Sequence, residues 1–205
     1  MIAIIDYDAG NIRSVEKAFV SLGQEVTVTR DAGVLRSADK VVLPGVGNFG
    51  DCMQNLEKFG LVPVIREIAS SGKPFLGICV GLQLLFEESE ESPGVKGLGI
   101  LKGRILRIPE GENRKIPHMG WNSIHLIGQN GTGRLFSGIP EQSYVYFVHS
   151  YYLKAADESI VTATTEYGVT IHASVEKGNV FATQFHPEKS SDTGLAILRN
   201  FAGLS

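Results

Sequence analysis

The sequence has 205 residues, of which 43% are hydrophobic and 20% charged, a composition typical of one globular domain spanning residues 1–205. The formal net charge is -3 and the lysines and arginines are scattered, so we expect no nucleic-acid partner. The chain starts with MIAIIDYDAG, which lacks a basic leader and is too short in its apolar run for a signal peptide or membrane span. We therefore expect a cytoplasmic protein with no membrane partner.

The first half of the chain alternates short apolar runs with helical periodicity. Strands are predicted at 2–7, 25–30, 40–45 and 73–79. Helices are predicted between the first strand and Gly23, across 53–72 with an interruption near Gly60 and Pro63, and over 80–89. Apolar strands that alternate with helices are typical of a parallel sheet covered on both faces.

After about residue 99 the pattern changes to strands in succession. Six segments have a strand pattern, at 100–109, 120–127, 144–153, 159–166, 169–176 and 179–186. Turn signals at 167–168 and 177–179 favour hairpins, and a last helix is predicted at 194–204. We therefore predict an α/β fold with a mostly parallel sheet flanked by helices and antiparallel strands added in the C-terminal half.

A glycine-rich loop, LPGVGNFGD at 43–51, has the G-x-G-x-x-G spacing of a dinucleotide-binding turn. Such a turn normally follows the first strand of its unit, with an acidic residue about 20 positions later at the end of the next strand. Here the loop follows a later strand, and the acid nearest that distance, Glu67, falls inside a helical pattern. We therefore predict no nucleotide cofactor, and the glycines need another explanation.

The segment GICVG, residues 77–81, has the pattern of a nucleophile on a sharp turn between strand and helix. Such a turn requires small residues two positions before and after the nucleophile, and Gly77 and Gly81 flank Cys79 in this way. A helix that starts at Val80 would favour the thiolate over the thiol. The alternative is a small buried hydrophobic residue. We favour that alternative for Cys52, which lies in a helical pattern.

A base and an orienting group follow from ATQFHPEKS, residues 182–190. His186 and Glu188 are two apart, so in an extended segment their side chains leave the same face. Pro187 keeps the backbone between them out of a helix. Such a pair could activate the thiol of Cys79, although H-P-E alone is a surface turn in most proteins.

The remaining histidines compete with His186 for the role of base. His125 and His172 alternate with apolar neighbours, so we expect exposed strand residues, whereas His118 and His149 could line a pocket. Only His186 has a carboxylate at a spacing that orients it. Neither cysteine belongs to a cluster of ligand residues, so we predict no metal site.

Acyl transfer also requires N–H groups aimed at the developing oxyanion. The loop at 43–51 should reach the carboxyl edge of the sheet beside the Cys79 turn, where glycines allow the backbone to approach a ligand. We predict an oxyanion hole made by the backbone of Gly45, Val46 and Gly47 with the amide of Val80.

Three segments, GICVGLQLLF, QFHPEKS and LPGVGNFGDCM, resemble the signatures of class I, triad-type glutamine amidotransferases, which have a flavodoxin-like fold. The similarity extends from residue 2 to about residue 203. DYDAGNIRSVEKAF, PHMGWN, YFVHSYY and HPEKS are similar to the glutaminase subunits of imidazole glycerol phosphate synthases, in histidine biosynthesis. This implies glutamine as the substrate, a Cys79, His186 and Glu188 triad, and hydrolysis through a glutamyl thioester.

The resemblance also implies a partner and further site residues. The ammonia would pass to a (β/α)8-barrel cyclase in a heterodimer, which makes imidazole glycerol phosphate and AICAR. Residues expected to bind glutamine are Gln83, His149, Ser150 and Tyr151. Residues expected to face the partner are Asn11, Trp121, Tyr146 and Lys189. The alternatives are a helix-surface role for Gln83 and a core position for Trp121.

Two other functions fit parts of these motifs. A free-standing thiol hydrolase would share Cys79 and His186 but would need neither Gln83 nor a partner surface. A non-catalytic module that docks to a synthetase would not need the triad.

The resemblance further implies a glutaminase that is nearly silent until the cyclase binds its nucleotide ligand. Glycines on both sides of Val46 would make a peptide flip in the oxyanion loop sterically easy.

Overall fold

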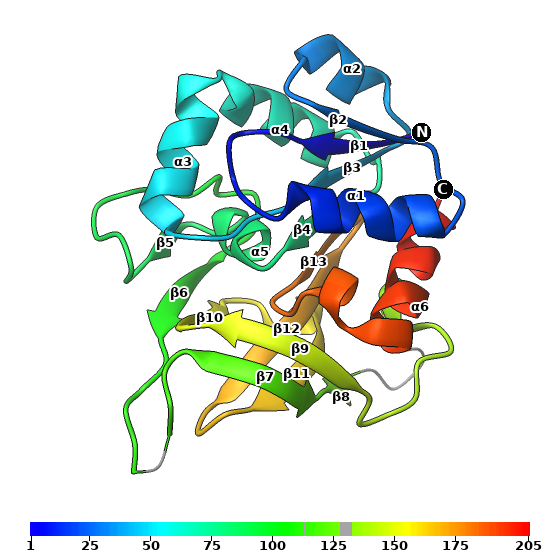
Figure 1. Ribbon diagram of the computed structural model, residues 1–205. Coiled ribbons are helices and arrows are strands. Elements are labelled where there is room, and N and C mark those ends of the chain that lie inside the picture. The colour runs from blue at the N-terminus through cyan, green and yellow to red at the C-terminus, as the bar shows by residue number, and fades with distance from the viewer. Residues whose placement is uncertain (113, 128–132) are drawn as a thin grey trace.

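The computed structural model describes residues 1–112, 114–127 and 133–205, and its centre is an eight-stranded sheet with the order β2-β1-β3-β4-β13-β12-β11-β8 (Figure 1). The parallel strands are β1 (Ile2–Ile5), β2 (Val26–Thr29), β3 (Lys40–Leu43), β4 (Phe75–Ile78) and β13 (Val180–Thr183). The antiparallel strands are β12 (Thr170–Lys177), β11 (Val161–Glu166) and β8 (His125–Leu126). The predicted fold class, with antiparallel strands added in the C-terminal half, is confirmed.

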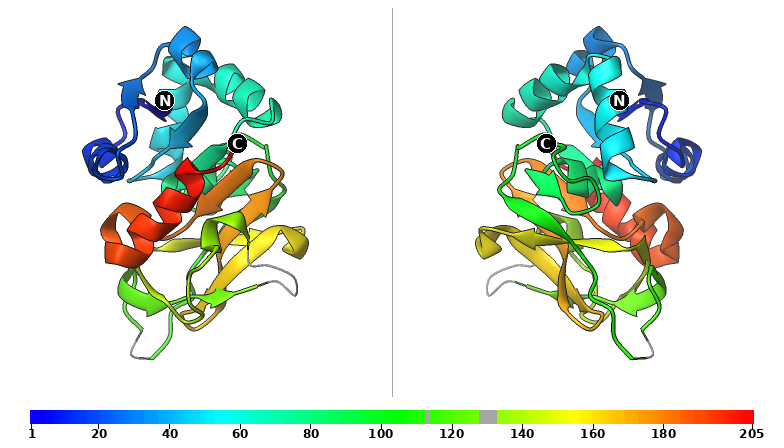
Figure 2. Two further views of the ribbon diagram at one scale, coloured as in Figure 1. Left: turned by 90° about the vertical axis from the view of Figure 1, so that its right-hand side faces the viewer. Right: turned by 90° about the vertical axis from the view of Figure 1, so that its left-hand side faces the viewer.

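Helices cover both faces of the parallel part of the sheet (Figure 2). One face carries α1 (Ile12–Ser21) and α6 (Ser191–Ala202). The other carries α3 (Phe49–Lys58) and α4 (Leu61–Ser70). The short helices are α2 (Ala32–Ser37) and α5 (Val80–Leu84), and 3-10 turns lie at Arg134–Phe136, Glu158–Ile160 and Pro187–Lys189. Every residue of β1, β4 and β13 is buried, as expected for strands covered on both faces.

Two small sheets lie beside the antiparallel strands of the main one (Figure 1). The first has the order β10-β6-β5, formed by β10 (Tyr151–Ala155), β6 (Gly103–Arg107) and β5 (Glu88–Ser89). The second is a ribbon of β7 (His118–Ser123) and β9 (Tyr144–His149). The sequence segments 120–127 and 144–153 were each predicted as one strand, and each is in fact two strands in different sheets. Apolar alternation does not show where a chain leaves one sheet for another.

Two helical predictions also need correction, and one helix was not predicted. The segment 53–72 belongs to two helices that separate at Gly60, as predicted, but Pro63 lies in the first turn of α4, where its missing N–H costs no hydrogen bond. The helix at 80–89 ends after five residues because the chain turns into β5. Helix α2 was missed because it is short and contains a glycine, although Asp31 caps it through the Val34 amide.

The carboxyl ends of β3 and β4 meet the start of α5 backbone to backbone. A Cβ added to Gly81 would lie 2.0 Å from the carbonyl oxygen of Leu43, and one added to Gly77 would lie 2.8 Å from the carbonyl oxygen of Gly81. Only glycine permits this approach. It brings the glycine-rich loop that follows β3 against the turn that carries Cys79.

Replacing Gly81 by Ala should therefore destabilise the protein by about 3–5 kcal/mol, because the new methyl group would overlap backbone that no rotamer can move. Equilibrium unfolding in urea measures this loss. Gly72 is the matched control, since it has φ +83° and open space around it. Gly72→Ala should cost only the conformational strain, about 1–2 kcal/mol. Equal losses in the two variants would contradict the packing argument.

Candidate active site

Cys79 lies on a strained turn at the carboxyl edge of the sheet. It follows β4 and precedes α5 with φ 54° and ψ -108°, a conformation that L residues rarely adopt. Its amide donates a hydrogen bond of 2.8 Å to the carbonyl of Thr183 on the neighbouring strand β13. This is the strand–turn–helix geometry of a nucleophile at the edge of a sheet, which the glycine pattern predicted.

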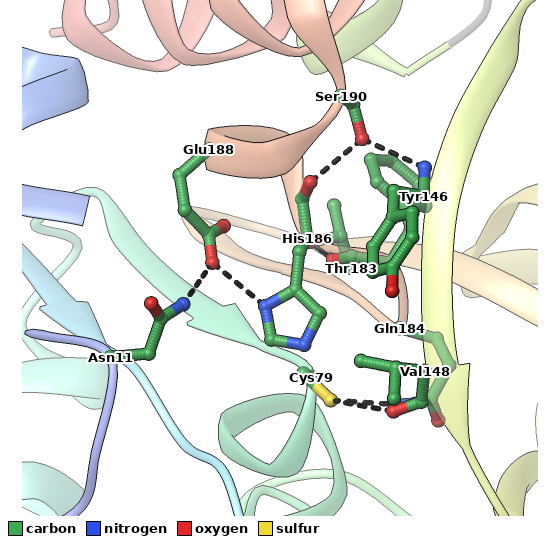
Figure 3. Close-up of polar contacts among 10 residues, drawn as sticks. Asn11, Cys79, Tyr146, Val148, Thr183, Gln184, His186, Glu188 and Ser190 are labelled. Atoms are coloured by element: carbon green, nitrogen blue, oxygen red, sulfur yellow. Dashed lines mark hydrogen bonds and ion pairs between the residues drawn. The ribbon is translucent and has the colours of Figure 1, made fainter. Parts of the chain in front are cut away.

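The sulfur of Cys79 has two polar neighbours (Figure 3). It lies 4.0 Å from the carbonyl oxygen of Val148, and the side-chain amide of Gln184 donates to it at 3.8 Å. Gln184 was not predicted. It is fully buried within the apolar strand segment that ends at His186, so a polar residue inside a buried run was the available signal.

His186 and Glu188 form the predicted pair. Nδ1 of His186 lies 2.7 Å from Oε1 of Glu188, and the side chains are 1% and 0% exposed. The predicted backbone path was wrong, because Glu188 lies in the 3-10 turn Pro187–Lys189 and only His186 is extended. The turn, and not strand alternation, brings the carboxylate back to the ring.

Two opposing effects act on the pKa of His186. Burial disfavours the charged ring, but the neighbouring Cys79 and Glu188 outweigh it and raise the pKa to about 10. Nε2 of the ring points toward the Cys79 sulfur and makes no hydrogen bond within the described residues (Figure 3). At neutral pH the ring is therefore an imidazolium that faces the Cys79 sulfur.

Asn11 contacts the same carboxylate. Its side-chain amide donates to Oε1 of Glu188, which joins the loop after β1 to the turn before α6 (Figure 3). Asn11 begins α1 with a left-handed backbone and makes no side-chain cap, so its amide is available for Glu188. The residue that the resemblance assigns to a partner surface therefore also touches the proposed triad.

In the loop at 43–51, which is the predicted oxyanion loop, one carbonyl already accepts a hydrogen bond from a predicted oxyanion donor. The amide of Val80 donates to the carbonyl of Gly45 at 3.3 Å. Gly47 has φ +98°, and a Cβ there would meet no atom within 4 Å. The loop thus approaches the Cys79 turn as predicted. The amide of Val80, which is predicted to donate to the substrate oxygen, donates instead to the carbonyl of Gly45.

Two buried side chains hold the other carbonyls of this loop. The hydroxyl of Tyr7 donates to the carbonyl of Pro44 at 2.6 Å, and the thiol of Cys52 donates to the carbonyl of Val46 at 3.6 Å. Cys52 is 4% exposed, and burial raises its pKa to about 11. The prediction of a buried, unreactive Cys52 agrees with this environment.

A pocket of about 170 Å³ opens beside Cys79. Its lining consists of Val46, Gly47, Cys79, Val80, Gln83, Glu91, Val148, His149, Ser150, Tyr151 and His186. All four residues predicted to bind glutamine are among them. Gln83 is 3% exposed, so it is no helix-surface residue, and its amide donates to the carbonyl of Tyr151 at 3.1 Å. A volume below the roughly 300–1,000 Å³ of drug-sized sites suits a ligand the size of one amino acid.

Glu91 also lines this pocket and was not predicted. One carboxylate oxygen accepts a hydrogen bond of 2.8 Å from the amide of Phe49, and burial raises its pKa. In the sequence Glu91 belongs to the acidic run FEESEES, and no feature of that run distinguishes it from the other glutamates. Its fold position alone identifies it as the pocket's negative charge.

The other histidines divide differently from the prediction. His149 lines the pocket, and His118 lies behind it with Nδ1 3.0 Å from Nε2 of His149. His125 is partly exposed beside Glu141. His172 was predicted to be exposed, and this was wrong. It is 5% exposed and accepts a hydrogen bond from the amide of Ala155, because β10 packs across β12 at this point.

The outer face of the β7–β9 ribbon is apolar and exposed. Trp121 is 52% exposed and therefore not part of the core, and its ring meets that of Tyr146 edge to face at 6.2 Å. Met119 and Tyr144 are 62% and 61% exposed on the same ribbon. Lys189, in the turn that carries Glu188, is exposed as well.

Neither a metal centre nor a membrane span is found in the described part of the chain. Within residues 1–112, 114–127 and 133–205, no three His, Cys, Asp or Glu side chains come together as metal ligands would. None of the helices in these ranges combines the length and apolar character that crossing a bilayer requires.

Comparison with known proteins gives concordant results. The family model for glutamine amidotransferase class-I matches residues 3–203. A Moorella thermoacetica protein named imidazole glycerol phosphate synthase subunit HisH is 53% identical over 203 residues, covering 99% of this chain and 94% of the relative. A Methanocaldococcus jannaschii protein with the same name is 50% identical, covering 100% of both chains. A crystal structure of a glutamine amidotransferase, 21% identical and covering 100% of both chains, shares the fold with a TM-score of 0.76.

Replacing Glu188 by Gln should slow alkylation of Cys79 by iodoacetamide at pH 7 by roughly tenfold, the effect of one pKa unit. The reason is that Oε1 of Glu188 orients the imidazolium of His186 toward the sulfur, and a ring without this partner supports the thiolate less. Mass spectrometry of the labelled peptide measures the rate.

Cys52 is an internal reference for this experiment, because its burial and raised pKa should leave it unlabelled. Glu57→Gln makes the same charge change on the exposed surface of α3 and should not alter the rate. A Glu188→Gln protein that is labelled as fast as the wild type would show that the carboxylate does not support the thiolate.

Proposed function

The chain belongs to the class I glutamine amidotransferase family, and we propose that it is the glutaminase subunit of an imidazole glycerol phosphate synthase. It would hydrolyse glutamine to glutamate and ammonia and supply the ammonia to a cyclase subunit in histidine biosynthesis. The observation that carries the proposal is the Glu188–His186 pair aimed at Cys79 within a pocket sized for an amino acid. We further propose that residues 1–205 act as one domain, located in the cytoplasm, where a catalytic thiol stays reduced.

The chemistry follows from the triad's geometry. The Cys79 thiolate attacks the side-chain amide carbon of glutamine, and the imidazolium of His186 gives its Nε2 proton to the departing nitrogen, which leaves as ammonia. A glutamyl thioester remains. The neutral ring of His186 then takes a proton from a water molecule that attacks the thioester, and glutamate and the thiolate separate. Glu188 orients the ring through Nδ1 in both steps.

The pocket offers complementary groups for the rest of the substrate. Glu91 supplies the negative charge that the α-ammonium group of glutamine requires. A pocket of about 170 Å³ is small for a peptide or a larger conjugate, which supports glutamine over the substrates of a general thiol hydrolase.

The outer face of the β7–β9 ribbon suits the barrel partner. Met119, Trp121 and Tyr144 expose large apolar surface, with Tyr146 behind Trp121. Exposed aromatic residues of this kind are typical of protein interfaces. Lys189 and Asn11 lie near the same edge as Glu188, so a partner seated there would also lie close to the triad.

The resting oxyanion loop gives a reason for dependence on the partner. While the Gly45 carbonyl occupies the Val80 amide, one oxyanion donor is missing. A missing donor slows turnover by roughly 10²- to 10³-fold. Rotation of the Gly45–Val46 peptide would free the Val80 amide and turn the Val46 N–H toward the site, and we propose this rotation as the activating step.

The first test is glutamate release from glutamine by the purified chain, alone and with a cyclase subunit and its nucleotide substrate. The proposal predicts strong stimulation by the partner, roughly 10²-fold or more if one oxyanion donor is restored. Cys79→Ala should abolish activity in both conditions. Full activity without the partner would indicate an independent hydrolase, and no activity in either condition would favour a docking module.

The second test is Gly47→Ala. At φ +98° an alanine is strained, so the variant should change the conformation of the loop and alter the ratio of stimulated to basal activity. Gly23→Ala, at φ +74° in open space on another loop, is the control for strain alone. An unchanged ratio in a folded Gly47→Ala protein would argue against rotation of the loop.

A further inference from the structure

Two buried histidines behind the pocket take no part in the proposed chemistry. His118 on β7 and His149 on β9 stand directly opposite each other in the strand register, and their side chains touch through Nδ1 and Nε2 at 3.0 Å. They are 3% and 6% exposed. Burial lowers the pKa of His118 to about 4 and that of His149 to about 3, so both rings are neutral at pH 7.

The hydrogen bonds specify one tautomer for each ring. Nδ1 of His149 lies 2.8 Å from the carbonyl oxygen of Tyr151, which can only accept, so Nδ1 carries the proton. Nε2 of His149 is then an acceptor, and Nδ1 of His118 must be its donor. Nε2 of His118 in turn faces the side-chain amide of Asn122 at 3.3 Å, a donor that fits. Every nitrogen of the pair therefore has a matched partner.

The last acceptor of this series belongs to the pocket wall. The carbonyl of Tyr151 accepts hydrogen bonds from the ring of His149 and from the amide of Gln83, at 2.8 and 3.1 Å. The same amide of Gln83 lies 3.2 Å from the side-chain oxygen of Gln184, whose own amide donates to the Cys79 sulfur. The segment from His149 to Tyr151 is thus fixed to the groups that surround the nucleophile.

Aromatic packing fixes the position of His118. Its ring stacks on Tyr167 at 3.9 Å between centroids, and on Phe147 at 4.8 Å. A ring that stacks on two others cannot rotate freely, so packing keeps its Nδ1–H directed at His149. Loss of that donor would leave Nε2 of His149 buried and unpaired, which is costly enough for the ring to turn and release Tyr151.

We propose that His118 is a positioning residue for the glutamine pocket. It does not touch the substrate. It donates to Nε2 of His149, holds that ring in the orientation in which Nδ1 donates to the Tyr151 carbonyl, and so keeps the pocket wall from His149 to Tyr151 in place. The pocket's identity as a glutamine site rests on the proposed function, whereas the fixed tautomer of His149 does not.

The kinetic test uses two replacements of His118 in the complex with the cyclase and its nucleotide. His118→Phe keeps a stacked ring but removes the donor, and it should raise KM for glutamine roughly three- to tenfold, with kcat changed less than about twofold. His118→Asn places an amide donor near the position of Nδ1 and should recover most of the lost KM. A KM that stays at the wild-type value in folded His118→Phe would overturn the proposal.

His172→Phe is the matched control. His172 is an equally buried histidine whose Nδ1 accepts from the Ala155 amide, and it makes no hydrogen bond to the pocket wall among the described residues. This variant should lower the melting temperature without changing KM. A similar rise in KM for His172→Phe would show that general destabilisation explains the result, which would also overturn the proposal.

A spectroscopic test is independent of activity. Long-range ¹⁵N–¹H spectra of the histidine rings should show His149 protonated at Nδ1 in the wild type and in His118→Asn, and a mixture of tautomers in His118→Phe. Protonation of His149 at Nε2 in the wild type would overturn the proposal. If the wild type releases no glutamate, the proposed function fails, while these spectra still decide whether His118 fixes His149.

Discussion

The contact between the end of β3 and the first turn of α5 is the constraint on which the site depends. The carbonyl of Leu43 leaves no space for a side chain at Gly81, so the two backbones touch directly. This contact sets the strained conformation of Cys79 against the loop that carries Gly45. The nucleophile and the predicted oxyanion loop are therefore placed side by side by contacts between backbone atoms.

Strand pairing brings the base to the nucleophile. Parallel β4 and β13 are in a register that sets Ile78 opposite Thr183, and the Cys79 amide continues the pairing to the Thr183 carbonyl. His186 then follows at the same edge of the sheet, as ligand sites in open α/β sheets do. The Ser190 hydroxyl holds this segment against β9, since it accepts a hydrogen bond from the amide of Tyr146 and donates one to the carbonyl of His186 (Figure 3).

Local signals allowed the sequence to predict the sheet class, the turn around Cys79 and the pairing of His186 with Glu188. Each depends on residues within a few positions of one another. Burial of His172 and the role of Glu91 depend instead on segments that pack from elsewhere in the chain, which periodicity does not reveal. The Val80 amide lies beside the pocket, as the sequence predicted. The sequence could not predict that this amide donates to the Gly45 carbonyl, because glycine permits either orientation of the peptide.

The hydrogen bond between Asn11 and Glu188 joins residues separated by 177 positions, and Cys79 lies between them in the sequence. The nucleophile is therefore synthesised long before its base, and the carboxylate that orients the base meets its amide donor only when the first loop and the last helix have packed together. Until then Cys79 has no oriented base beside it. The triad is therefore assembled by closure of the whole chain and not by any single segment of it.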